Sequence, residues 1–242
     1  MPLRIAMWSG PRNISTALMR AWENRFDTAV IDEPFYAHYL LATCLAHPGA
    51  AEVIAHHETD PRRIIDTLIG PVPGSAPIFY QKHMAHHLLP GIDRAWLDSV
   101  TNCFLIREPR EMLASLAKTI PHPRLADTGL PQQAELFNHV TQQTGETPIV
   151  LDARDVLQDP EGMLRMLCDR LGIDFSDRML HWPAGPRNTD GIWAPHWYAA
   201  VWKSTGFEPY RPKDEPLPAH LHALRDQCTP LYDRLHAHRL QS

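Results

Sequence analysis

The sequence predicts an α/β fold of three layers, in which a mostly parallel central sheet carries helices on both faces. Short apolar runs alternate with segments of helical periodicity from residue 3 to about residue 171. Two of these runs lead directly into a polar loop and then a helix, and no internal repeat interrupts the alternation. Continuous apolar runs are typical of parallel strands, because helices cover both of their faces.

The expected elements follow this alternation in order. The predicted strands are residues 3–8, 28–32, 77–82, 100–106 and 148–152. The predicted helices are residues 15–25, 109–118, 131–144 and 160–171, with further helical material from the second strand to about residue 70. In such sheets ligands bind outside the carboxyl ends of the strands. We expect strand 28–32 to lie beside strand 3–8, so that residue 33 neighbours the loop after the first strand.

The last quarter of the chain differs, because it is rich in proline and aromatic residues. We interpret residues 182–216 as an irregular covering segment, or lid, and residues 217–238 as a terminal helix. Its aromatic side chains either line a ligand pocket or pack on the core, and packing is the commoner role. Residues 1–242 are expected to form a single domain, since this length suits one sizeable α/β core.

Composition indicates a soluble enzyme. The net charge is −5 and no basic run is present, so we expect neither nucleic acid nor an anionic membrane as a partner. No run approaches the ~18 apolar residues of a membrane helix, and the N-terminus has no signal-peptide pattern. Cys103 and Cys168 fall on apolar faces, as reduced core thiols do, which favours a cytoplasmic location. The sequence leaves the oligomeric state open.

The most informative segment is Ser9-Gly-Pro-Arg-Asn-Ile-Ser-Thr16, which follows the first apolar run. A strand, a tight loop and a helix N-terminus together make an anion site, because free N–H groups converge there and the helix dipole adds positive charge. Arg12 and two hydroxyls add donors, so the ligand implied is a phosphate or sulfate. The Walker pattern fails, since Ser15 and Thr16 stand where Gly and Lys are needed. The alternative is that Ser15 merely caps the helix.

A second segment, residues 102–118, has a related design. Its apolar run ends at Arg107, and Ser115 lies on the margin of the helix that follows Pro109. A planar guanidinium and a hydroxyl directed into one crevice can clamp a phosphate. The alternative is a surface Arg107 that pairs with Glu108 or Glu111.

Together these segments resemble the cofactor-binding signatures of the sulfotransferase family, which uses 3′-phosphoadenosine 5′-phosphosulfate as its donor. The resemblance covers roughly residues 3 to 175, including the strand, loop and helix that start at residue 149. It implies that Arg107 and Ser115 hold the 3′-phosphate. It also implies a loop for the 5′-phosphosulfate, made of Pro11, Arg12, Asn13, Ile14, Ser15 and Thr16.

One position departs from the family pattern. Asn13-Ile14 stands where the family has Ser-Gly, and Gly normally lets the backbone approach the anion. A β-branched residue is not expected at positive φ. We therefore expect Ile14 to turn toward the apolar face that it shares with Leu18 and Trp22, while Ser15 still caps the sulfonate. Lys203 and Gly206 loosely resemble the family's C-terminal loop over the 3′-phosphate.

Sulfonate transfer requires positioned cations, here Arg12, and a general base. Glu33 resembles the base that follows the second strand in some relatives, and Pro34 is expected to hold it in extended geometry. His83 resembles the Lys-x-His of the cytosolic enzymes, but it directly follows Lys82, which would place its ring on the opposite face of the strand. Glu33 is the preferred candidate, and Lys82 is expected to reach the sulfonate.

No metal is expected. His83, His86 and His87 invite a metal site, but no evident carboxylate or Cys completes a ligand set, so His86 and His87 are interpreted as polar surface. The resemblance implies transfer of a sulfonate group to a hydroxyl or amine of a small-molecule acceptor. The alternative is a nucleotide- or anion-binding protein of the same fold without transfer activity, to which Ile14 in the loop would be suited.

Overall fold

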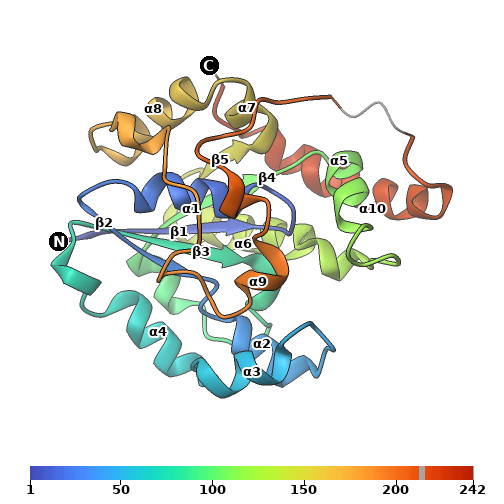
Figure 1. Ribbon diagram of the computed structural model, residues 1–242, viewed down its shortest axis with the longest axis horizontal. Helices are drawn as coiled ribbons and strands as arrows, with labels where there is room; N and C mark the ends of the chain where they lie inside the picture. The colour runs from blue at the N-terminus through green and yellow to red at the C-terminus, as the bar shows by residue number, and fades with distance from the viewer. Residues whose placement is uncertain (213–215, 242) are drawn as a thin grey trace.

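The computed structural model describes residues 1–212 and 216–241 and contains a sheet of five parallel strands (Figure 1). The order across the sheet is β2-β3-β1-β4-β5. The predicted α/β class, with a parallel sheet between two layers of helices, is confirmed. The strands are β1 (Leu3–Ser9), β2 (Thr28–Asp32), β3 (Ile78–Met84), β4 (Thr101–Ile106) and β5 (Ile149–Asp152).

The prediction that β2 lies beside β1 is wrong. β3 lies between β2 and β1, with Ile78 opposite Leu3 on one side and opposite Thr28 on the other. The burial of the two strands explains this order. Six of the seven residues of β3 are buried, whereas four of the five residues of β2 are only half-buried, as suits the edge of a sheet.

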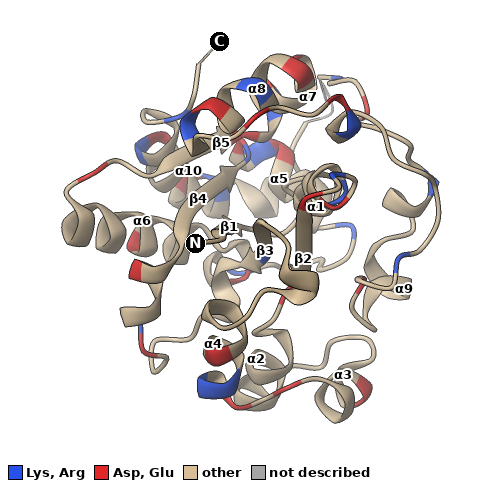
Figure 2. Ribbon diagram, turned by 90° about the vertical axis from the view of Figure 1, so that its left-hand side faces the viewer, with Lys and Arg blue, Asp and Glu red and all other residues tan. Residues whose placement is uncertain are grey.

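Helices cover both faces of the sheet, which Figure 2 shows nearly end-on. One face carries α1 (Ser15–Glu23), α7 (Ala153–Gln158) and α8 (Pro160–Leu171). The other carries α4 (Pro61–Ile69), α5 (Pro109–Leu116), α6 (Leu130–Thr144) and α10 (His222–His236). Alternate residues of β1 serve the two layers: Trp8 packs toward the second set and Met7 toward the first.

The helix ends follow the sequence. Pro160 occupies the first turn of α8, Asp159 caps it and Gly172 at φ 69° ends it, so the predicted span is exact. α1 ends two residues before its predicted end, and α10 begins at His222 after a short 3-10 turn. Cys103 and Cys168 are buried and free, as predicted. Among the described residues, no helix is long and apolar enough to cross a membrane.

A third group of elements lies over the carboxyl ends of β2 and β3. It consists of α2 (Tyr36–Thr43), α3 (Ala50–His56) and α9 (Ala194–Trp197). Trp193 and Tyr198, from the segment predicted as a cover, pack here with Tyr36 and Leu40 in one buried cluster. Residues 213–215 of that predicted segment lie outside the described residues.

Candidate active site

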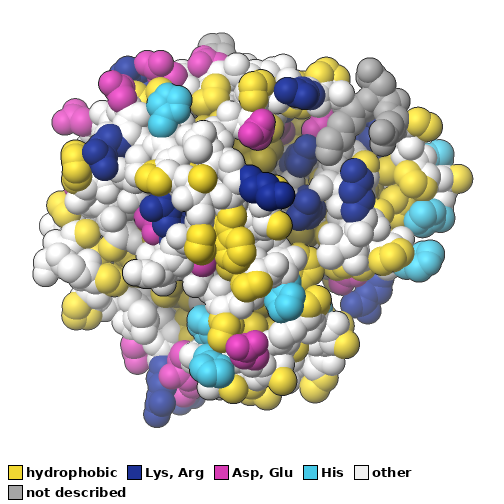
Figure 3. Space-filling view, in the orientation of Figure 1, with side chains coloured by type: hydrophobic (Ala, Val, Ile, Leu, Met, Phe, Trp, Pro, Cys, Tyr) yellow, Lys and Arg dark blue, Asp and Glu magenta, His cyan; other side chains and the backbone are white. Residues whose placement is uncertain are grey.

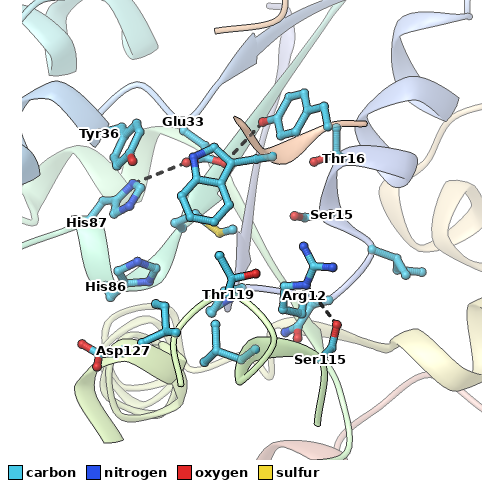
Figure 4. A pocket seen from close by; sticks show the side chains of 18 of the residues that line it. Arg12, Ser15, Thr16, Glu33, Tyr36, His86, His87, Ser115, Thr119 and Asp127 are labelled. Carbon is cyan, nitrogen blue, oxygen red and sulfur yellow. Dashed lines mark hydrogen bonds and ion pairs between the residues drawn. The ribbon is translucent and has the colours of Figure 1, made fainter. Parts of the chain in front are cut away.

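A pocket of about 290 Å³ opens at the carboxyl ends of the strands. Two sets of side chains face each other across it (Figure 4). The first, which we name the loop side, comprises residues 11–16 with Arg107 and Ser115. The second, the imidazole side, comprises Glu33, Tyr36, Tyr39, His47, His86 and His87. The loop that follows β1 and the 3-10 turn that follows β3 thus meet at one ligand-sized space.

The loop after β1 has an unusual backbone. Arg12 and Ile14 have φ of 65° and 58°, whereas Asn13 between them does not have positive φ. Alternation of this kind turns successive N–H groups toward a common centre, where an anion fits. The buried Asn13 side chain donates to the carbonyl of Leu105 (3.0 Å) and ties the loop to β4.

Ile14 corrects one expectation and fulfils another. It adopts the left-handed conformation that is not expected of a β-branched residue, at a cost of about 1–3 kcal/mol. Its side chain packs beside Leu18 and Trp22 on the apolar face of α1, as predicted. This packing and the anchoring of Asn13 hold the strained backbone in place, so the loop keeps its shape without glycine.

The N-terminus of α1 is left open to the pocket. Ile14 occupies the cap position, no side-chain hydrogen bond is made there, and the first turn contains no acidic residue. By contrast, α4, α5, α7 and α8 are each capped by a carboxylate, from Asp60, Glu108, Asp152 and Asp159. The alternative that Ser15 only caps the helix is therefore not what the structure contains. The free N–H groups and the helix dipole favour an anion here.

Two arginines join the loop to α5. Arg12 Nε donates to Ser115 Oγ (3.0 Å), and Arg107 Nη1 donates to the carbonyl oxygen of Arg12 (2.7 Å). Arg107 also pairs with Glu111 (3.2 Å). The ion pair that was the alternative interpretation of Arg107 therefore coexists with its contact to the loop. Arg12 has no carboxylate partner among the described residues, and burial together with the nearby Arg107 lowers its pKa. Two guanidinium groups with one carboxylate leave local positive charge for an anion.

This positive charge is local. On the face drawn in Figure 3, several Lys and Arg side chains gather around a hollow to the right of centre. The chain as a whole carries a net charge of −5. The electrostatic attraction of an anionic ligand must therefore come from the site itself.

On the imidazole side, Glu33 follows β2 with φ of 42°, so the expected extended geometry before Pro34 is wrong. Two hydrogen bonds force this conformation: Glu33 N donates to the carbonyl of Lys82 (2.9 Å), and Tyr36 N donates to the carbonyl of Glu33 (2.9 Å). The carboxylate lines the pocket although β3 separates β2 from β1. Burial raises the pKa of Glu33, and repulsion by Asp32 adds to this, against the attraction of Lys82.

Lys82 does not reach the pocket, which corrects its predicted contact with a sulfonate. Its side chain is fully buried and does not line the cavity. The ammonium donates to Asp32 (2.8 Å), Glu33 (2.6 Å) and the hydroxyl of Tyr198 (2.6 Å). Three acceptors use all three donors of the group, so Lys82 supports Glu33 from beneath.

His83 lies on the opposite face of β3, as the one-residue offset predicts. Its ring stacks on Trp8, with centroids 4.3 Å apart, in the core cluster that also contains Phe35 and Trp96. It does not line the pocket, and burial lowers its pKa to about 3. A ring enclosed by aromatic side chains has no access to an acceptor, so the structure does not support His83 as the base.

The C-terminal positions Lys203 and Gly206 also lie outside the pocket. Lys203 is exposed to solvent, and Gly206 pairs with His181 in an isolated bridge. The covering segment instead contributes Trp197, Tyr198, Ala200 and Val201 to the lining. Lys203 and Gly206, which loosely resemble a basic glycine loop, therefore contribute nothing to the lining of this cavity.

The structure adds residues that sequence reasoning missed. His86 and His87, interpreted as polar surface, line the pocket beside Tyr36 and Tyr39, and His87 is buried while His86 is half-buried. Their position directly after β3 was the available signal, because ligands gather at the carboxyl ends of parallel strands. Among the described residues, no three His, Cys, Asp or Glu side chains are grouped to hold a metal ion.

Known proteins resemble this chain over nearly its whole length. Two proteins of Arabidopsis thaliana, named branched-chain-amino-acid aminotransferase-like proteins 1 and 2, are 37% and 36% identical to it, over 98% and 97% of its residues. The matches cover 42% and 41% of those proteins, so this chain spans less than half of their length.

Solved structures support the fold. A sulfotransferase from Alicyclobacillus acidocaldarius superposes with a TM-score of 0.59 at 14% identity, covering 100% of this chain and 98% of that one. The sulfotransferase domain from the curacin biosynthetic pathway gives 0.55 at 15% identity, covering 95% and 98%. The family described as "Sulfotransferase domain" matches residues 3–239, and the chain therefore belongs to the sulfotransferase family.

Proposed function

We propose that this chain transfers a sulfonate group from 3′-phosphoadenosine 5′-phosphosulfate to a hydroxyl or amine of a small-molecule acceptor. The observation that carries the proposal is the open N-terminus of α1, at the end of a loop whose alternating backbone faces a pocket. Beside it lies Arg12, without a carboxylate partner among the described residues. These groups fit a phosphosulfate, which offers several anionic oxygens to N–H donors.

The donor would lie along the loop side. The 5′-phosphosulfate would lie against residues 11–16 and the first turn of α1, and the 3′-phosphate against Arg107 and Ser115. The hydrogen bond between Arg12 and Ser115 (3.0 Å) makes these two subsites neighbours. A nucleotide with phosphates on both its 3′ and 5′ positions would thus meet a guanidinium group at each end.

The acceptor would enter from the imidazole side, where Glu33 is the candidate base. Its carboxylate accepts a proton from the acceptor hydroxyl or amine while the new bond to sulfur forms and the bond to the 5′-phosphate breaks. Arg12 and the N–H groups of α1 stabilise the negative charge that develops on the transferred group and on the leaving phosphate. The raised pKa of Glu33 makes it a stronger base than an exposed carboxylate.

The second candidate function is binding of a nucleotide or anion without transfer. The reason for considering it is Ile14, which stands in the loop where the family has glycine. Ile14 adopts φ of 58°, the conformation for which the family uses glycine, so the substitution does not by itself disable the loop. The identity of residue 14 is therefore no reason to prefer binding alone over transfer.

A transfer assay tests the proposal. The protein is incubated with donor carrying a radiolabelled sulfonate and with a panel of alcohols, phenols and amines. We expect labelled acceptor in an amount equal to the adenosine 3′,5′-bisphosphate released, and a rate roughly 10²–10⁴-fold lower with Glu33→Gln. Tight binding of the donor with no label on any member of the panel would favour the alternative.

A further inference from the structure

Two unpaired atoms face each other on the imidazole side. His87 Nδ1 lies 3.8 Å from Glu33 Oε2, and Nδ1 is buried without a hydrogen-bond partner. This separation is too long for a direct hydrogen bond. Figure 4 shows both side chains directed into the same part of the pocket.

The two tyrosine hydroxyls nearest this pair are already engaged. Glu33 Oε1 accepts from Lys82 (2.6 Å), and the hydroxyl of Tyr198 donates to Asp32 (2.7 Å). The hydroxyl of Tyr36 is bonded to a ring nitrogen of His47 (2.9 Å). Neither tyrosine hydroxyl is therefore free to bridge His87 Nδ1 and Glu33 Oε2. Oε2 is the oxygen of Glu33 that remains to accept a proton.

His87 is held in a fixed orientation. Its ring stacks on Tyr36 with centroids 4.7 Å apart at 12°, and on Tyr39 with centroids 4.7 Å apart at 30°. Burial lowers the pKa of His87 well below its ordinary value, so the ring is neutral. A neutral ring beside a carboxylate favours the tautomer that carries its hydrogen on the nearer nitrogen, here Nδ1.

We propose that His87 and Glu33 hold the reacting atom of the acceptor between Nδ1 and Oε2, and that this arrangement selects a hydroxyl oxygen over an amine nitrogen. The inference rests on the proposed function and names His87 as a residue that positions and selects the acceptor. One bridging atom would accept a hydrogen bond from Nδ1–H and donate its own hydrogen to Oε2.

The selection follows from lone pairs. A hydroxyl oxygen has two, so one accepts from His87 while the other forms the bond to sulfur. An amine nitrogen has one, which it must keep for sulfur, so it leaves Nδ1–H unpaired. During the step the hydroxyl proton moves to Glu33 Oε2 and the new O–S bond forms. The S–O bond to the 5′-phosphate breaks, and its electron pair leaves on adenosine 3′,5′-bisphosphate.

The test compares matched acceptors in three variants. Phenol with aniline, and benzyl alcohol with benzylamine, are assayed with radiolabelled donor in the wild type, His87→Asn and His87→Leu. Asn presents an N–H near the position of Nδ1, whereas Leu presents none. His83→Asn serves as the matched control, because His83 is also a buried, ring-stacked imidazole but lies outside the pocket. The affinity for adenosine 3′,5′-bisphosphate is measured for every variant.

The wild type should favour the hydroxyl member of a pair, and His87→Leu should lower kcat/KM for that member about 10- to 100-fold, the range of one lost hydrogen bond. The amine member should change little, and His87→Asn should recover most of the loss. Absence of a hydroxyl preference in the wild type, or an equal loss for both members in His87→Leu without recovery in His87→Asn, would overturn the inference. Failure of every variant, including the wild type, to bind adenosine 3′,5′-bisphosphate would instead contradict the proposed function.

Discussion

The two sides of the pocket are built differently. The loop side comes from two continuous strand–loop–helix segments, at the start of α1 and of α5, and it presents guanidinium groups and free backbone N–H groups. The imidazole side is assembled from the end of β2, the turn after β3, α2 and the covering segment. It presents a carboxylate and imidazoles whose pKa values are lowered by burial.

Under the proposed function, this difference corresponds to what each side would recognise, namely the donor on the loop side and the acceptor on the imidazole side. Phosphate and sulfate groups have a fixed shape and charge, so the same local segment can hold them wherever it occurs. An acceptor is recognised by the shape of a cavity, and separate parts of the chain can form that cavity in many ways. Under the proposed function, the loop side would hold the fixed anionic groups of the donor, and the imidazole side would be shaped by the acceptor.

The sharpest test of the division is Glu33→Gln, which should act on the imidazole side alone. We expect single-turnover rates to fall roughly 10²–10⁴-fold, the size of a lost general base, while donor affinity stays unchanged. Glu33→Asp, which keeps a carboxylate near Lys82, separates loss of the base from loss of the buried ion pair. If His83→Asn abolished turnover while Glu33→Gln kept a near-normal rate, the assignment of the base would be wrong.

Arg107→Ala should act on the loop side alone. Loss of its contact with the 3′-phosphate should cost about 2–4 kcal/mol of nucleotide affinity, as for a charge-assisted bidentate contact. The cost should nearly vanish for adenosine 5′-phosphate, which lacks that group. Calorimetric titration with both ligands measures the difference, and equal weakening of the two would refute the role of Arg107.

Low pH should destabilise the folded protein, because some of its imidazoles are harder to protonate in the folded chain than in the unfolded chain. Burial lowers the pKa of His83 to about 3 and of His86 to about 4, from 6.5. The unfolded chain takes up protons below pH 6.5 that the folded chain does not, so this stability is present above pH 6.5 and is lost as the pH falls toward 3. Each ring contributes a slope of roughly 1.4 kcal/mol per pH unit within its window. Urea unfolding of His83→Phe should show a smaller slope between pH 6 and 4 than the wild type.

Tyr198→Phe should uncouple the cover from the strand ends. The hydroxyl accepts from Lys82 (2.6 Å) and donates to Asp32 (2.7 Å), so its removal leaves buried polar atoms unpaired at a cost of about 1–3 kcal/mol. Urea unfolding measures the loss. Tyr36→Phe, which removes one hydrogen bond to His47, should cost less. An equal cost for both variants would mean that the buried ion cluster does not depend on Tyr198.

Much of the loop side could be predicted from sequence because local rules decide it. An apolar run, a Gly-Pro turn and a helical pattern place Arg12 and Ser15 at a strand-to-helix junction without knowledge of the fold. The spacing of Arg107 and Ser115 works in the same way, and both line the pocket. The left-handed conformation of Ile14 was missed because propensity disfavours it, and only the packing beside Leu18 and Trp22 holds it there.

The imidazole side could not be predicted in the same way, because its structure depends on contacts between distant segments of the chain. The sequence does not state that β3 separates β2 from β1, and that order brings Lys82 beneath Glu33. The ion pair and two backbone hydrogen bonds then override the extended preference of a residue before proline. His86 and His87 look like polar surface in the sequence, but α2 supplies Tyr36 and Tyr39, whose rings pack against them.

The most direct test of the central claim is calorimetric titration of the wild-type protein with adenosine 3′,5′-bisphosphate, adenosine 5′-phosphate and ATP. The account predicts that the bisphosphate binds most tightly, because only it meets Arg107 and Ser115 with one phosphate and the loop of residues 11–16 with the other. Equal affinity for all three nucleotides, or a preference for ATP, would contradict the division of the pocket into a donor-binding loop side and an acceptor-binding imidazole side.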